Sequence, residues 1–403
     1  MELNKDLPSI TSVSRRESRL HILEIIGNAG IGGMESYIKN FISHLPANQF
    51  RVTCICPNES EFTSAIRQLG VEDVFITPIE DDPCWRSVQL VAEVARLNQI
   101  DVLHAHMPKA HVLAGIAGSL IRKPVVATVH GMNVTSHELG ITRAVGSHLF
   151  TNCQEAYTQA LAMGVEPDRV NLIRNGVDLT VFKPGRTSNT LRESIGISND
   201  TMLVGFVGRL EQEKGPDMFI RAADVVHQHC PDAHFVVVGD GVMRGRLQEM
   251  CSHLQLKQHV HFTGWMSTDE VYPSLDVLAH TSRSDGTSLV LLEAMACECP
   301  TVGLAVGGVR EIIEHESTGF LVGAGDWEKV GDRILQLLEK PKLRQSMSAA
   351  ARLRVEQYFN IKSNTLQTAE MLRDIAFPGV NGHNFANTTT LSREIGGRKS
   401  VDN

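Results

Sequence analysis

The amino-acid sequence predicts an α/β protein with two domains, each built on a doubly wound parallel sheet. Three observations support this fold class. The chain has 403 residues, which is long for a single hydrophobic core. Short runs rich in β-branched residues alternate with amphipathic helical segments, a pattern typical of parallel sheets covered by helices on both faces. The alternation also starts twice, at residues 20–26 and, after a polar turn, at residues 202–207.

The first half opens with an apolar run that leads into a glycine-rich loop at residues 27–33 and a helical pattern at 34–45. Strand, glycine loop and helix form the opening unit of a Rossmann-like domain. The glycine spacing does not match the dinucleotide fingerprint, which argues against NAD. A ligand-binding loop and a simple tight turn fit these residues equally well. The other strands expected here are 52–56, 74–76, 102–106, 125–130, 149–153 and 170–173, with helices at 87–97 and 110–121.

Residues 175–178 and 182–185 are typical of a turn and a linker, and the strand pattern restarts after them. Each strand of the second half ends at a glycine or a polar loop. Because ligands bind beyond the carboxyl ends of parallel strands, two such domains would form a binding cleft between them. The strands expected in this half are 202–207, 234–238, 260–263, 276–280 and 301–306, and three closing helices are expected at 327–338, 343–359 and 361–375.

Composition excludes some classes of function. The net charge of -8 and the pI of about 6.1 argue against a nucleic-acid partner, which usually requires a basic surface. The sequence contains no signal-peptide core and no apolar stretch of membrane-spanning length. We therefore expect a cytoplasmic protein and leave peripheral association with the inner face of a membrane open. The polar residues 1–19 and 377–403 are expected to form a disordered leader and a disordered tail.

Histidines and cysteines are the candidate metal ligands of this sequence. His104, His106 and His130 fall at expected strand ends on one sheet edge, which favours a binding site. No carboxylate lies near them in the sequence, so a metal site is the weaker interpretation. The pairs at 54/56 and 297/299 have the spacing C-x-C, which is poor for zinc. These cysteines are expected to be buried thiols, and no metal is expected.

The segment 284–300, SDGTSLVLLEAMACECP, combines several functional signals. Asp285 is expected to be exposed, with Thr287 or Ser288 capping a helix that follows immediately. A helix N-terminus offers unpaired N–H groups and partial positive charge, so it can bind a phosphate. Glu293 is an acid within an apolar run and requires a partner, either sugar hydroxyls or an arginine.

Arg209 and Lys214 lie five residues apart in a polar loop, next to an expected helix start. Two fixed cations there suit a diphosphate, because they would bind it and neutralise its charge as it leaves. The alternative is a solvated loop of mixed charge.

In this order and spacing, the motifs resemble the retaining, GT-B-fold glycosyltransferases of family 4, also called group 1 glycosyltransferases, over residues 20–376. The resemblance is strongest in the segment 284–300. The supporting motifs are Gly32-Gly33-Met34-Glu35, His104-Ala105-His106, Asn175-Gly176-Val177-Asp178, Gly208-Arg209-Leu210 with Lys214-Gly215, and Gly307-Gly308-Val309-Arg310-Glu311.

The resemblance implies two Rossmann-like domains that face each other across a cleft. Residues 20–182 would form the acceptor domain and residues 183–360 the donor domain, with a helix at 361–376 crossing back to the first. Glu293 would bind the ribose of the donor, and Arg209 and Lys214 its diphosphate. The donor-binding residues implied are Gly32, Gly33, Arg209, Lys214, Thr287, Ser288, Leu289 and Glu293.

The resemblance also implies a catalytic set. Asp285 would contact hydroxyls of the transferred sugar, His130 would lie beside that sugar, and Arg209 and Lys214 would stabilise the leaving group. The chain departs from the family pattern at two positions, with Asp285 in place of Glu and Glu298 in place of Gly. If position 298 needs a left-handed backbone, its side chain costs about 1 kcal/mol.

The function implied is retaining transfer of a sugar from a nucleoside-diphosphate sugar, most simply a UDP-sugar, to a hydroxyl acceptor, either a sugar or a lipid-linked sugar. It would serve polysaccharide, lipopolysaccharide or other glycoconjugate synthesis, by metal-independent front-face substitution and without a cofactor. A sugar-nucleotide 2-epimerase and a non-catalytic donor-binding subunit are the alternatives, the latter motivated by Asp285 and Glu298.

Overall fold

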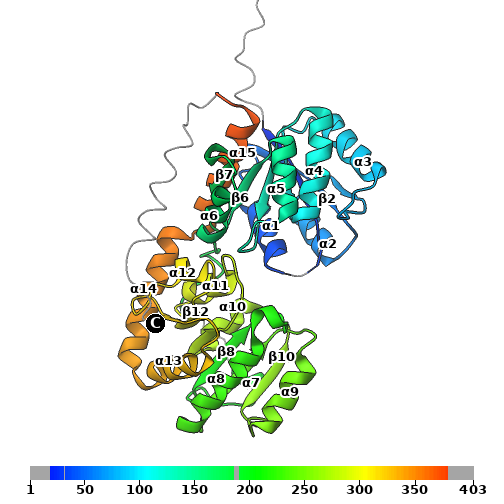
Figure 1. Cartoon of the computed structure of the whole chain (residues 1–403). Helices are drawn as coiled ribbons and strands as arrows, with labels where there is room; N and C mark the ends of the chain where they lie inside the picture. Colours follow the sequence, from blue (N-terminus) through cyan, green and yellow to red (C-terminus); the bar gives the residue numbers. More distant parts are fainter. Residues whose placement is uncertain (1–18, 31, 186–189, 380–403) are drawn as a thin grey trace, which may run out of the picture.

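The computed structural model describes residues 19–30, 32–185 and 190–379, and it contains two α/β halves that face each other (Figure 1). All strand pairs within the two sheets are parallel, as the sequence predicts. The expected disorder of the leader and the tail falls almost entirely outside the described residues.

The first sheet has the strand order β3-β2-β1-β4-β5-β6-β7. Its interior strand β1 is buried along its whole length, because helices cover both faces of the sheet. The strands are β1 Leu20–Ile26, β2 Phe50–Cys56, β3 Val74–Ile76, β4 Val102–His106, β5 Val125–Val129, β6 His148–Thr151 and β7 Val170–Leu172. The helices are α1 Gly33–His44, α2 Glu61–Gln68, α3 Trp85–Leu97, α4 Pro108–Ile121, α5 Ser136–Val145 and α6 Gln154–Ala162, with a short 3-10 helix at Pro167–Arg169.

The second sheet has the order β10-β9-β8-β11-β12-β13. Its strands are β8 Leu203–Val207, β9 His234–Val238, β10 Val260–Gly264, β11 Val277–His280, β12 Thr301–Leu304 and β13 Phe320–Val322. Its helices are α7 Thr190–Ser194, α8 Pro216–His229, α9 Arg244–His253, α10 Thr268–Val271, α11 Leu289–Ala296, α12 Val309–Ile312, α13 Trp327–Glu339 and α14 Pro341–Tyr358, with 3-10 turns at Gln212–Lys214 and Tyr272–Ser274. A last helix, α15 Ile361–Ala376, follows α14 in the chain.

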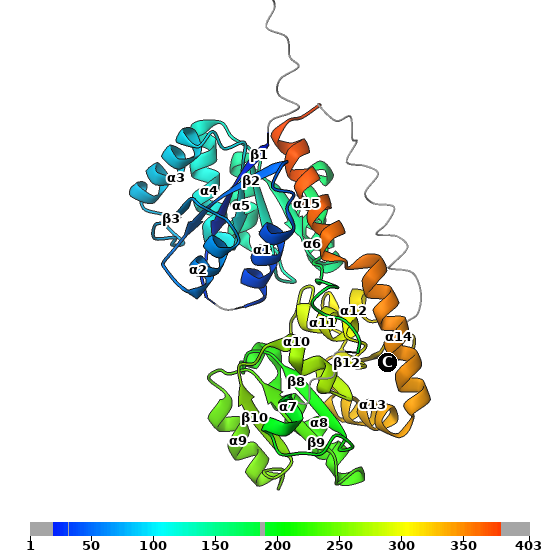
Figure 2. The ribbon, with the colours of Figure 1, turned by 180° about the vertical axis from the view of Figure 1, so that it is seen from behind.

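Two apolar clusters fill the two faces of the first sheet. Helices α3 to α6 contribute to one cluster, and α1 and α2 contribute to the other. The second cluster also contains Ala369, Leu372 and Ile375 of α15, although α15 follows the second half in the sequence. Figure 2 shows α15 lying along the first half, directly after α14 of the second. Burial of its apolar face therefore anchors the end of the described chain to the first half.

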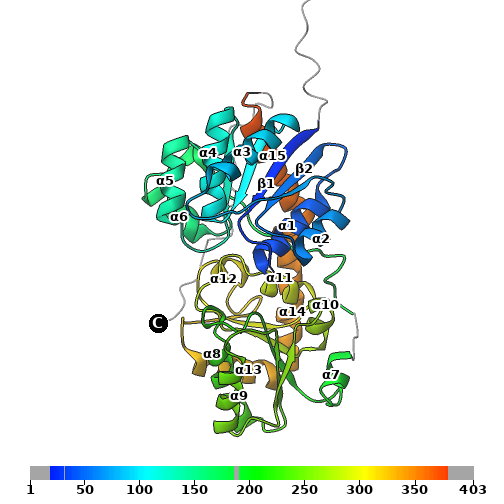
Figure 3. The ribbon, with the colours of Figure 1, turned by 90° about the vertical axis from the view of Figure 1, so that its right-hand side faces the viewer.

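The chain passes between the halves at two neighbouring places (Figure 3). The backbone N–H of Val177 donates to the carbonyl oxygen of Phe359 at 2.8 Å. A Cβ atom on Gly176 would lie 2.5 Å from Cα of Ile361, so only glycine permits this contact. The linker and the α14–α15 junction thus form one packed crossing. The predicted domain limits at 182/183 and 360/361 stay a prediction.

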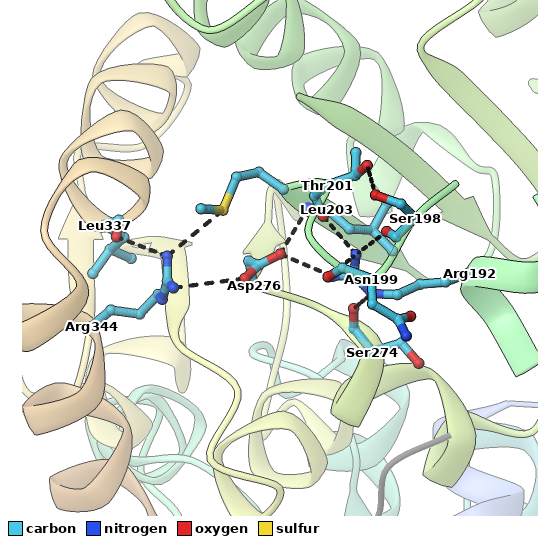
Figure 4. Close-up of polar contacts among 10 residues, drawn as sticks. Arg192, Ser198, Asn199, Thr201, Leu203, Ser274, Asp276, Leu337 and Arg344 are labelled. Atoms are coloured by element: carbon cyan, nitrogen blue, oxygen red, sulfur yellow. Dashed lines mark hydrogen bonds and ion pairs between the residues drawn. The ribbon is translucent and has the colours of Figure 1, made fainter. Parts of the chain in front are cut away.

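A polar cluster forms where the second sheet begins (Figure 4). The Oδ2 atom of Asp276 accepts from Arg192 Nη2 at 3.0 Å and from the backbone N–H of Leu203 at 2.9 Å. Arg344 of α14 lies 3.8 Å from the other carboxylate oxygen. One acid, immediately before β11, therefore joins α7, β8 and α14.

Candidate active site

A cavity of about 560 Å³ lies between the two halves, where the carboxyl ends of strands from both sheets meet. The ten residues predicted for the site all line it, although they come from four separate segments of the chain. They are Gly32, Gly33, His130, Arg209, Lys214, Asp285, Thr287, Ser288, Leu289 and Glu293. The structure thus brings the predicted residues together, while their roles stay a prediction.

Asp285 was predicted to be exposed, and this prediction is wrong, because its carboxylate is enclosed by two hydrogen-bond donors. Its Oδ2 atom accepts from Lys214 Nζ at 3.1 Å and from His280 Nε2 at 3.0 Å, and its side chain is 15% exposed. Burial alone would raise the pKa of Asp285, but the hydrogen bond from His280 and the charge of Lys214 lower it to about 2. Asp285 is therefore ionised, and it links the loop after β8 to the start of α11.

The predicted helix begins as expected, but its cap is different. Ser288 is the N-cap residue of α11 and makes no side-chain capping hydrogen bond. Its hydroxyl lies 3.1 Å from His280 Nε2, while the Thr287 hydroxyl donates to the carbonyl of Asn152 in the other half. The first N–H groups of α11 have no acceptor within the helix, so they present positive potential at the cavity.

Glu293 pairs with hydroxyl groups and not with an arginine. Its Oε2 atom accepts from Tyr272 at 2.8 Å and from Thr268 at 3.2 Å. Burial raises the pKa of Glu293 to about 7, although the two hydrogen bonds act in the opposite direction and lower it. This carboxyl group therefore changes charge near neutral pH and can respond to a ligand.

Arg209 lines the cavity from the loop after β8 and pairs with Glu211 at 2.6 Å. Its side chain is 40% exposed, so the pair is worth little and can be exchanged. Lys214 is more enclosed, at 23% exposed. Both cations therefore have carboxylate partners in the absence of a ligand.

The two halves touch beside the cavity. A Cβ atom on Gly286 would lie 2.7 Å from the carbonyl oxygen of His130 and 2.9 Å from the side chain of Asn152. Asn152 also donates to that carbonyl at 2.9 Å. Glycine at 286 is therefore required by close packing against the first half.

The prediction for the three histidines needs two corrections. His104 lies in the middle of β4 and not at a strand end, and it is fully buried together with His106. A carboxylate does lie near them, because β1 pairs with β4 and brings Glu24 alongside. Glu24 contacts His104 Nδ1 at 3.0 Å and His106 Nε2 at 2.6 Å. Of these three histidines, only His130 lines the cavity.

Glu24, His104 and His106 offer one ligand atom each within 4.8 Å of one another, which is a spacing that a metal ion could use. Every one of these atoms is also engaged in a hydrogen bond within the cluster. The cysteines at positions 54, 56, 297 and 299 are buried and free, as predicted.

Sequence reasoning missed the residues that hold the predicted ones in place. His280 ends β11 just before the segment 284–300, and its position at a strand end could have indicated it. Tyr272, Thr268 and Asn152 gave no signal, because they reach their partners only through the tertiary fold. Trp265, which is 54% exposed at the cavity, was also missed.

Two facing sheets of this kind, with a cavity between their carboxyl edges, define the GT-B class of glycosyltransferases. Residues 31–181 match the family model described as "Glycosyltransferase Family 4", and residues 187–354 match the model "Glycosyl transferases group 1". The chain belongs to the group 1, family 4 glycosyltransferases.

Several characterised proteins are similar in sequence. The N-acetyl-alpha-D-glucosaminyl L-malate synthase of Bacillus anthracis is 28% identical, over 72% of this chain and 79% of its own length. The UDP-Gal:alpha-D-GlcNAc-diphosphoundecaprenol alpha-1,3-galactosyltransferase of Escherichia coli is 26% identical, over 79% of this chain and 87% of its own.

Solved structures share the fold. HepE of Anabaena in complex with UDP has a TM-score of 0.79 at 23% identity, covering 88% of this chain and 100% of its own. Sucrose-phosphate synthase of Thermosynechococcus elongatus has a TM-score of 0.72 at 20% identity, covering 89% and 99%. Within the described residues, the helices are too short or too polar to cross a lipid bilayer.

Proposed function

We propose that the protein transfers a sugar from a nucleoside-diphosphate sugar, taken as a UDP-sugar, to an acceptor hydroxyl with retention of anomeric configuration. One observation carries this proposal. Two cations, a helix N-terminus and a carboxyl group with a pKa of about 7 converge on one cavity. Together they match the diphosphate and the ribose of such a donor.

The donor would bind along α11. Arg209 and Lys214 would exchange their present carboxylate partners for the diphosphate, and the first N–H groups of α11 would complete its binding. Glu293 would accept hydrogen bonds from ribose hydroxyls in its ionised form. The sugar would then extend toward Asp285 and His130, at the contact between the two halves.

Front-face substitution is the reaction that suits these groups. The bond between the anomeric carbon and the diphosphate oxygen breaks, and the acceptor oxygen bonds to the same face of that carbon. The acceptor proton passes to the departing diphosphate oxygen, whose charge Arg209 and Lys214 stabilise. Positioning and electrostatics would supply most of the rate. The site then needs no metal ion or cofactor.

A double displacement would require a carboxylate nucleophile at the anomeric carbon. Among the described residues that line the cavity, the carboxylates are Glu213, Asp285 and Glu293. Asp285 is the one that we place near the sugar, and a carboxylate whose pKa is lowered to about 2 is a weak nucleophile. This favours the front-face route.

We assign the acceptor to a sugar or lipid-linked sugar in polysaccharide, lipopolysaccharide or glycoconjugate synthesis. The name of the Escherichia coli relative gives a diphosphoundecaprenol-linked acceptor, and HepE was solved with UDP-glucose. Both names support a UDP-linked donor. With a lipid-linked acceptor, the protein would work at a membrane surface.

Two steps test the proposal. Calorimetric titration with UDP, GDP, ADP and NAD, with and without chelator, should show chelator-insensitive binding of UDP. Incubation with UDP-sugars and a panel of acceptors should then give a product whose anomeric configuration, read by NMR, matches the donor. Conversion of the UDP-sugar without any acceptor would instead indicate an epimerase. Binding without turnover would indicate a donor-binding subunit, and NAD binding would contradict the proposal.

A further inference from the structure

A chain of buried hydrogen bonds runs from the centre of the first sheet to the cavity. It starts at Glu24 of β1, passes through His106 of β4 and ends at His130, directly after β5. Glu24 Oε2 lies 2.6 Å from His106 Nε2, and His106 Nδ1 lies 2.9 Å from His130 Nε2. Glu24 and His106 are both 0% exposed, whereas His130 lines the cavity.

The proton positions in this chain follow from its buried end. Burial raises the pKa of Glu24, but the charges and hydrogen bonds of His104 and His106 lower it to about 2. The carboxylate therefore only accepts hydrogen bonds, so His106 must donate from Nε2. Burial also lowers the pKa of His106. In its neutral form, His106 has a lone pair on Nδ1.

That lone pair dictates the state of the next ring. His106 Nδ1 accepts a hydrogen bond, so His130 must donate from Nε2. Burial lowers the pKa of His130 well below its usual value, so this ring is neutral and its Nδ1 has no proton. Among the described residues, Nδ1 of His130 has no hydrogen-bond partner, and its ring borders the cavity.

We propose that Glu24 is a positioning residue for the glycosyl transfer. Acting through His106, it fixes the tautomer of His130 in which Nδ1 accepts a hydrogen bond from a hydroxyl group of the transferred sugar. The inference rests on the proposed function. It adds to the proposed site the fully buried residue Glu24, which is 0% exposed. The transferred sugar must then carry a hydroxyl group that can donate a hydrogen bond to Nδ1 of His130.

A second branch from Glu24 supplies a matched control. The other carboxylate oxygen accepts from His104 Nδ1 at 3.0 Å, and His104 Nε2 lies 2.7 Å from the hydroxyl of Thr128. This branch is equally buried, and neither residue lines the cavity. Thr128→Val therefore perturbs the same cluster and leaves the path to His130 intact.

A metal ion in the cluster would have the opposite effect. A metal bound to His106 Nε2 would take its lone pair, so that His106 Nδ1 would carry the proton and donate it to His130. The proton of neutral His130 would then lie on Nδ1. The tautomer of His130 thus distinguishes hydrogen bonding by Glu24 from a metal site.

The first measurement uses the unmodified protein. In ¹⁵N-histidine-labelled wild-type protein, with His130 assigned by loss of its signals in His130→Gln, two-bond ¹H–¹⁵N correlation should show a protonated Nε2 and an unprotonated Nδ1. Elemental analysis of the same protein should show no stoichiometric metal. A protonated Nδ1, or one equivalent of bound metal, would overturn the inference without any variant.

The second measurement compares ligands. In Glu24→Gln, the amide group can donate to His106 Nε2, which reverses the direction of the hydrogen bonds from residue 24 to His130. UDP affinity should stay within about twofold of wild type, whereas UDP-glucose affinity and kcat/KM should fall roughly tenfold, as expected for one lost hydrogen bond. Thr128→Val should leave both ligands within about twofold. An equal loss for UDP and UDP-glucose in Glu24→Gln would show a merely structural role. A wild-type protein that binds neither ligand would overturn the proposed function, while the tautomer measurement would still decide the state of His130.

Discussion

At the scale of single residues, two acids lie in places that lower the stability of the protein without a ligand. Glu293 has a carboxyl group enclosed against Tyr272 and Thr268, where ionisation is costly. Glu298 has a backbone φ of +58°, which side-chain-bearing residues rarely adopt. The ribose contact proposed for Glu293 would account for the first, because ribose hydroxyls would supply the hydrogen bonds that the ionised form lacks. Nothing in the structure explains why a glutamate occupies position 298.

Glu293→Gln should separate binding from stability. Removal of the charge-assisted hydrogen bonds should weaken UDP binding by about 1.5 to 3 kcal/mol. The folded pKa of about 7 exceeds the unfolded value, so stability is lost as pH rises from about 4.5 to 7. Since glutamine mimics the protonated acid, the variant should be more stable than wild type at pH 8, by about 3 kcal/mol, and similar at pH 4.5.

Calorimetry and urea unfolding at the two pH values test this expectation. Glu213→Gln is the control, because Glu213 lines the same cavity with its side chain 51% exposed, and it should not change the pH dependence. Unchanged UDP affinity in folded Glu293→Gln would contradict the ribose assignment.

Glu298→Gly should stabilise the protein by about 1 kcal/mol. Glu298 is exposed and follows the C-terminus of α11, where its N–H donates to Met295 and that of Cys299 donates to Ala294. These two hydrogen bonds form a Schellman motif, which favours glycine at this position. Glu298→Ala retains the left-handed strain and should give little change. Urea unfolding compares the variants, and equal stabilities for glycine and alanine would show that strain is not the cause.

At the scale of secondary-structure elements, the two sheets are joined to their helices by apolar packing, with a few polar contacts at strand ends. Asp276 is the clearest case, because it serves three elements at once (Figure 4). Its partner Arg192 is 10% exposed and also donates to backbone carbonyls of Ser274 and Thr201. Loss of the acid would leave that guanidinium enclosed without its counter-charge.

Asp276→Ala should therefore lower the free energy of unfolding by about 3 kcal/mol, as expected when one member of an enclosed ion pair is removed. Asp73→Ala is the matched control, because Asp73 pairs with Arg51 at 2.8 Å in an exposed setting and its loss should cost at most about 1 kcal/mol. Thermal unfolding compares the two. Equal losses would show that enclosure of the pair does not determine its contribution.

At the scale of the whole molecule, the halves are held together by contacts around the cavity and by the returning α15. Glu311 of α12 accepts from the backbone N–H of Gln154, at the start of α6, at 2.6 Å and from Arg174 at 3.1 Å. Asn152 and Asn175, close to Gln154 and Arg174 in the sequence, line the cavity, so we expect contact between the halves and binding of a ligand in the cavity to be coupled.

Buried histidines should make the whole protein sensitive to acid. Burial lowers the pKa of His111 to about 3 and that of His148 to about 4. The unfolded chain takes up protons on these side chains near pH 6.5. Their contribution is therefore complete above about pH 6.5 and is lost as pH falls toward 4. The apparent melting temperature should fall over that range.

A variant pair checks the assignment. His111→Gln should flatten the fall in melting temperature between pH 6.5 and 4, whereas His253→Gln, at an exposed position, should not. The same slope in both variants would exclude His111 as a source of the acid sensitivity.

The sequence by itself determined most elements and predicted ten residues that line one cavity. Periodicity and strand-end glycines placed the predicted strands and helices within two residues of their observed bounds, because each element has its own hydrophobic repeat. The strand β13, at Phe320–Val322, was not predicted. The ten residues that line the cavity could be named because their motifs resemble those of the family and because α/β folds bring the loops at carboxyl strand ends together.

Only the tertiary structure decided what each site residue contacts. Asp285 was predicted to be exposed, yet Lys214 enclosed it from 71 residues away. Glu293 found hydroxyl groups in place of an arginine, and Glu24 met two histidines about 80 residues later in the chain, across the β1–β4 pairing. Partners, burial and pKa depend on distances between segments far apart in sequence. Patterns in the sequence cannot predict those distances, because they relate only residues that are close together along the chain.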